Sequence, residues 1–408
     1  MKLPGRWRII PLNQVIRTLQ AGVSVNSLDE EVQDLKQIGI LKTSSVTTGR
    51  FDPRENKMVV QKDICRVKTP VQGDRIILSR MNTPCLVGAN AYVPQDYPNL
   101  FLPDRLWSLE PQGDFICMHW LSFVLGSSEY RQKLSELATG TSNSMKNISK
   151  DAVMALEIPY PPLPEQRRIA EFLGTWDEAI EKLERLIEAK EKRLSWIRAN
   201  ILTGKVRING FSSKWKQIIF LEIASRVTRS VGKARVAPVS ISAGKGFVLQ
   251  EEKFGRNIAG KQYSKYTLLF PEEFTYNKGN SKTYECGCVY QWRGKAPVAV
   301  PNVFVSFSLN AKLADARFIS HFFEADLHAN ELRKFINSGV RNDGLLNVTP
   351  DCFFKIILSL PELPEQKAIA NILDTTSQEI DILRAELIMF QKQKRGLMQK
   401  LLTGTWRV

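Results

Sequence analysis

LPEQRRIAEFLGTWDEAIEKLERLIEAKEKRLSWIRANILTGKVRI, at residues 163–208, is followed two hundred residues later by LPEQKAIANILDTTSQEIDILRAELIMFQKQKRGLMQKLLTGTWRV, at residues 363–408. The two segments align without a gap, with 15 identical residues in 46 positions. The match extends upstream, where Asn147-Ile-Ser-Lys-Asp151 corresponds to Asn347-Val-Thr-Pro-Asp351. This repeat predicts a duplicated chain, in which a globular segment is followed twice by the same element.

Each repeat carries the signals of a single long helix. Pro164 and Pro364 suit a first helical turn, and the glutamate after each proline complements the positive end of the helix dipole. Gly204 and Gly404 stand where a left-handed cap would end a helix. About 39 residues at roughly 1.5 Å each predict a rod of roughly 58 Å.

Apolar residues recur along both segments at alternating steps of four and three. Lys190 interrupts this ladder in the first segment, and Thr376 and Lys394 interrupt it in the second. The remaining ladder positions are Ile169, Leu173, Trp176, Ile180, Leu183, Ile187, Leu194, Ile197 and Ile201, and then Ile369, Leu373, Ile380, Leu383, Leu387, Phe390, Leu397 and Leu401. A period of 3.5 residues is that of a coiled-coil seam, so we expect the two helices to pair with each other.

The repeat divides the chain into a globular domain (1–162), a helix (163–208), a second globular domain (209–362) and a second helix (363–408). The second domain starts at the end of the first helix and leads into the start of the second. Because the termini of a domain usually lie close together, this connection favours an antiparallel helix pair. The predicted fold is α/β (mixed α+β), with two globular domains separated by two long antiparallel helices that form an intramolecular coiled coil with pseudo-two-fold symmetry.

The composition is that of a globular chain with a basic charge balance. The 408 residues include 57 Lys and Arg against 42 Asp and Glu, a net charge of +15. The sequence has no run of eighteen apolar residues and no secretory h-region, so we expect a cytoplasmic protein without a membrane segment. Six cysteines do not make a disulfide framework at this length. The positive charge favours a polyanionic partner, with nucleic acid as the first candidate.

The positive charge lies mainly in the globular domains. Residues 1–162 contain 19 basic and 16 acidic side chains, residues 209–362 contain 21 and 13, and each repeated segment has an excess of two basic residues. Mixed charges are typical of the solvated surface of a coiled coil. Two unlike domains on a two-fold frame would read two separate half-sites on duplex DNA, as dimeric readers do. The target is therefore expected to be asymmetric and bipartite.

Familiar motifs for catalysis and cofactors are missing from the sequence. It has neither a G-x-x-x-x-G-K-[ST] phosphate loop nor G-x-G-x-x-G, and it lacks the Asn-Pro-Pro-aromatic motif of amino-methyltransferases. Cys286-Gly-Cys288 has no second pair of cysteines, so it does not predict a zinc site. The stretch D-P-R-E-N-K at 52–57 is only faintly similar to a nuclease carboxylate cluster. We expect no catalytic residue, metal or cofactor in this chain.

Taken together, the motifs resemble those of the specificity (S) subunit of type I restriction-modification systems, over the whole chain. The two L-P-E-Q helices ending in L-T-G carry the resemblance with five shorter motifs: Trp7-Arg8, Trp215-Lys216, Lys42-Thr-Ser-Ser-Val46, Ser79-Arg-Met-Asn82 and Tyr276-Asn-Lys-Gly-Asn-Ser281. The resemblance implies that the globular domains are target-recognition domains for double-stranded DNA. It implies that the helices set the half-site spacing and dock two methyltransferase (M) subunits, joined by restriction/translocase (R) subunits. S-adenosylmethionine, ATP and Mg²⁺ would belong to those partners.

Polar side chains near expected strand ends are the candidate DNA contacts of the first domain. One run of small hydroxyl residues comprises Thr43, Ser44, Ser45 and Thr47. Such hydroxyls contact phosphates or bases, or they form an ordinary turn. Arg80, Asn82 and Thr83 follow the apolar run Ile76-Ile-Leu78, so we expect them on a loop after a strand. Arginine suits guanine and asparagine suits adenine, although the same groups also serve as structural caps.

The second domain has a denser polar set at the corresponding position, namely Tyr276, Asn277, Lys278, Asn280 and Lys282. Two lysines and two amides around Gly279 suit close approach to a DNA backbone. A cationic stretch, formed by Arg226, Arg229, Lys233 and Arg235, either steers phosphates or is an ordinary solvated surface.

Three functions follow from these features. The leading one is the non-catalytic DNA-recognition subunit of a multisubunit methyltransferase and restriction enzyme. An alternative is a stand-alone bivalent DNA-binding scaffold or repressor. A third is that the chain itself cuts or methylates DNA, through Glu55 and Lys57.

Overall fold

The computed structural model describes residues 5, 7–140, 145–255, 260–279, 284–336, 346 and 348–408. The chain divides into two compact units. Unit 1 combines Met1–Glu184 with Ala385–Val408, and unit 2 is Arg185–Arg384. Unit 1 is therefore discontinuous, because a segment from the far end of the sequence completes it.

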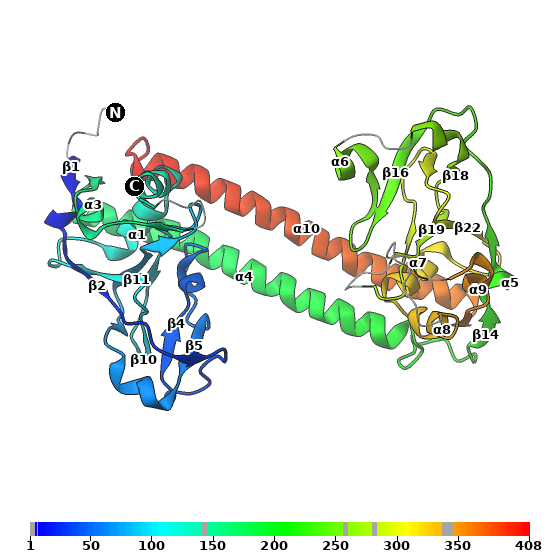
Figure 1. The fold of residues 1–408 in the computed structure, drawn as a ribbon, viewed down its shortest axis with the longest axis horizontal. Helices are drawn as coiled ribbons and strands as arrows, with labels where there is room; N and C mark the ends of the chain where they lie inside the picture. The colour runs from blue at the N-terminus through cyan, green and yellow to red at the C-terminus, as the bar shows by residue number, and fades with distance from the viewer. Residues whose placement is uncertain are drawn as a thin grey trace. The chain divides into compact units, whose positions relative to one another are not determined.

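Two long helices confirm the prediction made from the repeat (Figure 1). Helix α4 extends over Leu163–Ile201 and α10 over Leu363–Leu402. Each is followed by a glycine in the left-handed region, with φ +70° at Gly204 and +71° at Gly404. The backbone N–H two residues after each glycine donates to a carbonyl six residues earlier. This bond satisfies a carbonyl that a helix end would otherwise leave unpaired.

The globular part of unit 1 consists mainly of short strands. The strands are β1 (Arg8–Pro11), β2 (Ile16–Ala21), β3 (Ser27–Leu28), β4 (Gly39–Leu41), β5 (Asn56–Val59), β6 (Pro70–Val71), β7 (Arg75–Ser79), β8 (Met81–Asn82), β9 (Asn90–Val93), β10 (Tyr97–Phe101), β11 (Leu106–Pro111), β12 (Lys146–Asn147) and β13 (Glu157–Tyr160). The shorter helices are α1 (Met118–Gly126), α2 (Ser128–Glu136) and α3 (Lys150–Met154). One sheet has the order β2-β11-β7-β9 and another β3-β5-β4-β10-β6, while β1 pairs with β13 and β8 with β12.

Unit 2 is built in the same way. Its strands are β14 (Lys216–Ile219), β15 (Ala224–Arg226), β16 (Ala237–Ser242), β17 (Gly246–Leu249), β18 (Thr267–Leu269), β19 (Phe274–Asn277), β20 (Cys288–Gln291), β21 (Val298–Val300), β22 (Val305–Leu309) and β23 (Ile357–Leu360). Its shorter helices are α5 (Phe220–Ile223), α6 (Gln250–Phe254), α7 (Ala316–Glu324), α8 (Ala329–Arg333) and α9 (Pro350–Phe354). The sheets have the orders β15-β22-β19-β20 and β17-β16-β21-β18, and β14 pairs with β23.

The two units share one topology. The order β2-β11-β7-β9 of unit 1 corresponds strand by strand to β15-β22-β19-β20 of unit 2, and β5-β4-β10-β6 corresponds to β17-β16-β21-β18. A parallel pair, β4 with β10 or β16 with β21, occupies the same place in both sheets. Ser149 and Thr349 cap α3 and α9 with the same side-chain hydrogen bond. The duplication therefore includes the globular parts, although their sequences barely align.

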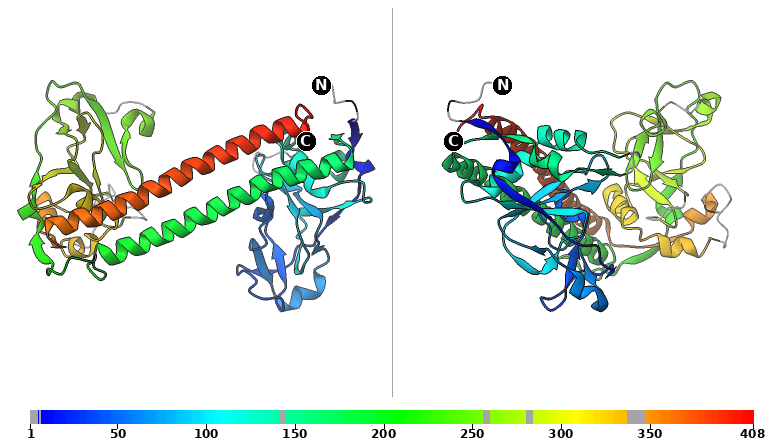
Figure 2. Two further views of the ribbon diagram at one scale, coloured as in Figure 1. Left: turned by 180° about the vertical axis from the view of Figure 1, so that it is seen from behind. Right: turned by 60° about the vertical axis from the view of Figure 1, so that its left-hand side comes forward.

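Within unit 1, the first part of α4 and the last part of α10 lie side by side and run in opposite directions (Figures 1 and 2). Near the start of α4, Glu165 accepts two hydrogen bonds of 2.8 Å from Arg407. The Arg407 guanidinium holds the pKa of the Glu165 carboxyl below its usual value. Further along α4, Asp177 pairs with Lys394 at 2.6 Å. Residue numbers rise along one helix and fall along the other, which confirms the antiparallel prediction in this unit.

Unit 2 repeats this arrangement with the two helices exchanged. Arg207, just beyond the end of α4, donates two hydrogen bonds of 2.7 Å to Glu365 at the start of α10. Lys190 pairs with Glu379 at 2.5 Å. The two lysines that interrupt the apolar ladder, Lys190 and Lys394, therefore each meet a carboxylate of the opposite helix. Charged seam residues of this kind specify register at some cost in stability. We call the two glutamate–arginine pairs, Glu165 with Arg407 and Glu365 with Arg207, the clasps.

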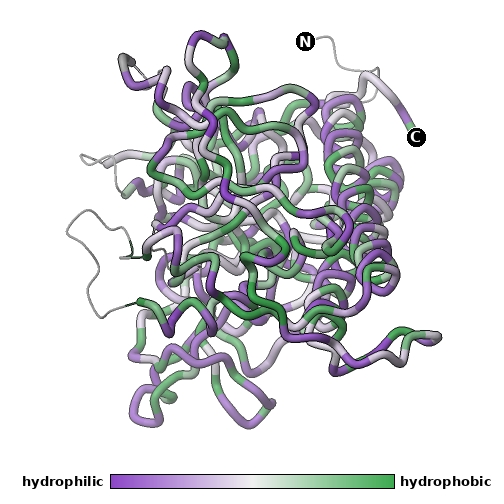
Figure 3. The backbone as a smooth tube through the Cα atoms, turned by 90° about the vertical axis from the view of Figure 1, so that its right-hand side faces the viewer, coloured by the Kyte–Doolittle hydropathy of each residue, from purple (hydrophilic) through white to green (hydrophobic). Residues whose placement is uncertain are grey.

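The apolar ladder forms the covered side of both helices, as its period predicts. Every ladder residue is buried or half-buried. In contrast, Ile382 and Ile388, which lie off the ladder, are 67% and 64% exposed. The helices accordingly show alternating hydrophilic and hydrophobic bands along their length (Figure 3).

The glutamine of each L-P-E-Q motif ties a long helix to its globular domain. Gln166 accepts a hydrogen bond of 2.9 Å from the backbone N–H of Cys117, the N-cap residue of α1. Gln366 accepts one of the same length from Asp315, the N-cap residue of α7. Both glutamines are almost fully buried. In the repeated motif, the glutamate therefore forms the clasp and the glutamine satisfies a helix N-terminus of the adjoining domain.

In the part of the chain that the structure describes, no helix has both the length and the apolar composition needed to cross a membrane.

The end of α10 belongs to the hydrophobic core of unit 1. Leu401 and Leu402 are 2% and 5% exposed, in one cluster with Trp107, Trp120 and Ile169. These residues are separated from the two leucines by more than two hundred positions in the sequence. The core of unit 1 is therefore incomplete without the C-terminal segment.

Replacing Leu401 by alanine should lower the free energy of unfolding of unit 1 by about 2–4 kcal/mol, because it leaves a cavity in this core. Hydrogen exchange should show faster exchange in β7, β11 and α1, while the strands of unit 2 keep their protection. Ile388→Ala, on the exposed side of the same helix, is the control and should change neither. Faster exchange confined to α10 would contradict the shared core.

Candidate nucleic-acid interface

The predicted contacts Arg80, Asn82 and Thr83 come after β7, as expected from the apolar run before them, but Asn82 lies in the short strand β8, which pairs with β12, and not on a loop. Arg80 Nε donates to the carbonyl of Asp104 at 2.8 Å. Asn82 Oδ1 accepts from the N–H of Thr83 at 2.9 Å, and Asn82 Nδ2 donates to Ser79 Oγ at 3.3 Å. No described residue accepts from the two terminal guanidinium nitrogens of Arg80. This side chain is thus oriented at one end and available to a ligand at the other.

The hydroxyl run of the first domain forms a 3-10 turn over Thr43–Val46. Ser44 Oγ donates to Glu55 at 2.5 Å, and Thr47 Oγ1 donates to the carbonyl of Ser44 at 3.1 Å. Ser45 is fully buried, and its hydroxyl has no partner among the described residues. A nucleic acid cannot reach Ser45 in this conformation, so the contact predicted for it is wrong. Thr43 remains a candidate, since it is half-buried and its hydroxyl makes no bond to a described residue.

In unit 2 the predicted contacts lie at the end of β19, but they do not all face outward. Tyr276 is fully buried, donates its hydroxyl to the carbonyl of Cys286 at 2.9 Å and stacks on Phe353. The prediction that Tyr276 contacts DNA is therefore wrong, because this strand lies between β22 and β20 and is covered on both faces. Asn277 and Lys278 are half-buried, and Asn277 Oδ1 accepts from the N–H of Gly279 at 2.9 Å. Asn280 and Lys282 lie outside the described residues.

The candidate contacts of the two units lie at the ends of corresponding strands. β7 and β19 each occupy the third position in the matching four-stranded sheets. Arg80 follows β7, whereas β19 ends in Asn277 and is followed by Lys278, so the same place in the fold presents different donors. Such a difference suits two domains that read different bases.

The stretch D-P-R-E-N-K at 52–57 has a structural explanation. Asp52 pairs with Arg54, and Lys57 pairs with Asp29, at 3.0 Å in both cases. Glu55 accepts the Ser44 hydroxyl, as described above. Among the residues that the structure describes, no three His, Cys, Asp or Glu side chains are grouped as a metal ion would require. These side chains are thus engaged with neighbours on the same surface.

A fully buried histidine, His328, precedes α8 in unit 2. Neither of its ring nitrogens has a hydrogen-bond partner among the described residues. A carboxylate oxygen of Asp326 lies 3.6 Å from Nδ1. Burial lowers the pKa of His328 to about 3, so the ring is neutral at physiological pH.

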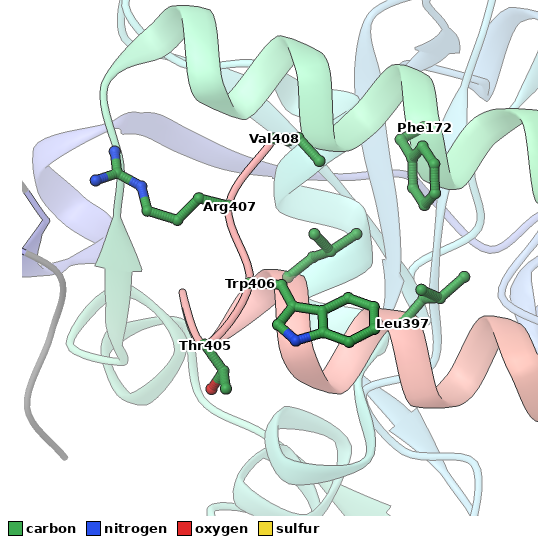
Figure 4. Close-up of a pocket in the computed structure, with 7 residues that line it drawn as sticks. Phe172, Leu397, Thr405, Trp406, Arg407 and Val408 are labelled. Carbon is green, nitrogen blue, oxygen red and sulfur yellow. The ribbon is translucent and has the colours of Figure 1, made fainter.

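An apolar groove opens in unit 1 where the end of α10 meets α4 (Figure 4). It is lined by Phe172 of α4, Leu397 and Leu401 of α10, and the tail residues Trp406 and Val408. Phe172, Trp406 and Val408 are each 40–49% exposed, which is high for large apolar side chains. Arg407, which forms the clasp with Glu165, also lines this groove. This groove was not predicted from the sequence, although a tryptophan soon after the L-T-G end of a helix is a signal of an exposed apolar site.

Unit 2 has the equivalent residues at the start of α10 and beyond the end of α4. Ile372 corresponds to Phe172 and Val206 to Trp406 at the offset of two hundred. Ile372 is 37% exposed and Val206 is 40% exposed. Each unit therefore presents partly exposed apolar side chains beside its clasp.

Comparisons with known proteins agree with this architecture. The family model described as "Type I restriction modification DNA specificity domain" matches residues 55–191. The type I restriction enzyme MjaVIII specificity subunit of Methanocaldococcus jannaschii is 21% identical, in an alignment covering all of this chain and 95% of the relative. The crystal structure of a type I S subunit from M. genitalium aligns with a TM-score of 0.58 at 15% identity, covering 98% of each chain. A structure solved in a study of type I assembly aligns with a TM-score of 0.56. These structures share the fold.

The buried histidine predicts a loss of stability in acid. Because the pKa of His328 is lower in the folded protein than the usual value near 6.5, protonation favours the unfolded state. The stability of unit 2 should be complete above about pH 6.5 and should fall by about 2 kcal/mol on lowering the pH to about 5. His328→Phe should remove most of this dependence in pH-dependent urea unfolding, without loss of stability at pH 7. An unchanged dependence would show that other groups cause the acid sensitivity.

Proposed function

We propose that this chain, which belongs to the family of type I restriction-modification specificity subunits, is the DNA-reading member of a larger methyltransferase and restriction assembly. Each globular domain reads one half of an asymmetric, bipartite target, and the paired helices set the gap between the halves. The observation that carries this proposal is the duplication itself. Two domains of one topology present different polar side chains at equivalent strand ends.

The proposal gives the two strand ends different tasks. The free end of Arg80 suits the O6 and N7 acceptors of a guanine in the major groove. Lys278, beside the turn at Gly279, suits the phosphate backbone or an acceptor on a base edge. A change at either place should therefore affect one half of the target and leave the other half unchanged.

The partners in this proposal are two methyltransferase subunits, joined by restriction/translocase subunits. The similar apolar side chains in both units support two copies of one partner, because an equivalent surface binds an equivalent ligand. Phe172 and Trp406 would anchor one copy, and Ile372 and Val206 the other. The relatives are named as subunits of type I restriction enzymes, so we prefer this role to that of a stand-alone repressor.

We further propose that this chain itself performs no chemical step. Glu55 and Lys57 have structural partners, which argues against the nuclease alternative. S-adenosylmethionine, ATP and Mg²⁺ would then be bound by the partner subunits. The chain would contribute affinity, sequence choice and spacing.

The proposed reading task is tested by mapping methylated sites after reconstitution with the methyltransferase partner. Arg80→Gln should relax base preference in one half of the target by roughly 5- to 150-fold, as expected for loss of a good bidentate contact. Lys278→Gln should alter only the other half or its affinity. Lys182→Gln, exposed on α4, is the control. If either domain variant changed both halves equally, the division of labour would be wrong.

The docking proposal predicts a change in stoichiometry. Phe172→Asp with Trp406→Asp should reduce the number of methyltransferase subunits per chain from two to one, because it places charges in an apolar contact. Ile372→Asp with Val206→Asp should release the other copy and also leave one methyltransferase subunit per chain. The variant with all four changes should bind no methyltransferase subunit. Native mass spectrometry measures this directly, with Leu35→Asp as the exposed-site control. Retention of two subunits in the fourfold variant would refute docking at these residues.

A further inference from the structure

The connection before the parallel strand pair carries opposite charge in the two units. In unit 1 it leads from β2 through the short strand β3 to β4, and residues 22–38 contain Asp29, Glu30, Glu31 and Asp34 with one lysine, Lys36. In unit 2 it joins β15 to β16, and residues 227–236 contain Arg229, Lys233 and Arg235 with no acidic residue. The net charges are −3 and +3 at the same place in one topology.

The basic connection of unit 2 is held by its own small core. Val231 is buried with Tyr266 and Ala299. The N–H of Val231 donates to the carbonyl of Tyr266 at 2.8 Å, and the N–H of Gly232 donates to Ser264 at 2.9 Å. The Tyr263 hydroxyl bonds both the N–H and the carbonyl of Val236. The connection is thereby tied to the neighbouring 3-10 turn at Gly260–Lys265.

Four cations of the connection and the neighbouring 3-10 turn have described side chains: one has a structural partner and three do not. Arg229 pairs with Glu273, donates to the carbonyl of Leu268 and lies over the ring of Phe270. Lys233, Arg235 and Lys265 are exposed and make no ion pair or hydrogen bond through their side chains to any described residue. These three exposed cations lie on backbone tied together by hydrogen bonds and pair with no carboxylate of a described residue, an arrangement that suits the binding of an anion.

We propose that Lys233, Arg235 and Lys265 form a cationic edge by which unit 2 grips the phosphate backbone of DNA, and that unit 1 has no counterpart. The inference rests on the proposed function and adds a division of the binding energy between the domains. Phosphate is favoured over base edges because three adjacent positive charges match the regularly repeated negative charge of the DNA backbone, whereas one guanine edge takes a single arginine or lysine. The connection of unit 1 keeps a net negative charge even though Asp29 pairs with Lys57. It therefore repels the same backbone, and unit 2 supplies more of the salt-dependent affinity.

The experiment measures the salt dependence of DNA binding by the reconstituted complex of the chain with its methyltransferase partner. Two duplexes are used, one with the mapped target and one with the same bases scrambled. Each lost phosphate contact lowers the slope of log affinity against log salt by about 0.9. The variant with Lys233→Gln, Arg235→Gln and Lys265→Gln should therefore lose about 2.7 from the slope on both duplexes. Between 50 and 200 mM salt its affinity should then fall roughly 40-fold less than that of the wild type.

Two controls make the result specific. Lys36→Gln removes the same kind of charge from the equivalent connection of unit 1 and should leave the slope unchanged. The exchange variant, with Lys233→Arg, Arg235→Lys and Lys265→Arg, keeps the charge and should keep the wild-type slope. Unchanged slope in the triple glutamine variant would overturn the proposal, as would a loss seen only on the target duplex, which would indicate base reading. Failure of the wild-type complex to prefer the target would instead refute the proposed function.

Discussion

The constraint on which this fold depends is the closure of each unit by a segment distant in sequence. In both units a glutamate at the start of one long helix binds the arginine that follows the end of the other. Each pair is bidentate, and its glutamate is nearly buried, so the geometry is tightly specified. Beside each clasp lies an apolar seam, which is interrupted by a lysine that pairs with a carboxylate of the opposite helix. The paired helices are therefore part of each domain's stability as well as a connection.

This closure explains why the repeated sequence is confined to the helices and their surroundings. The clasp, the buried glutamine and the glycine cap make contacts that both units need, and they are the residues that the repeat retains. The strand ends and the connection before the parallel pair make no such contacts. They are free to differ, and they differ in side-chain type and even in the sign of their charge. The proposed reading of two different half-sites requires this combination of a shared frame and unlike surfaces.

Much of the architecture follows from the sequence alone. The 3.5-residue period of the ladder, the prolines after residue 163 and residue 363, and the terminal glycines define both helices, and the chain connection gives their antiparallel direction. The roles of Glu165 and Gln166 could not be predicted, because their partners, Arg407 and Cys117, are identified only by tertiary structure. The prediction that Tyr276 contacts DNA is wrong for a related reason. Its polar neighbours resemble a loop, but β19 is an inner strand whose aromatic residues fill the core, and no local pattern distinguishes the two situations.

The central claim is that the paired helices determine the spacing of the recognised half-sites. Insertion of one heptad into α4 and one into the part of α10 that faces it keeps the seam in register and lengthens the pair by roughly 10.5 Å. That length corresponds to about three base pairs of duplex DNA. Sequencing of methylated sites should then give the same two half-sites with a gap about three base pairs longer. The original gap, retained by a folded and active assembly with the longer helices, would contradict the account.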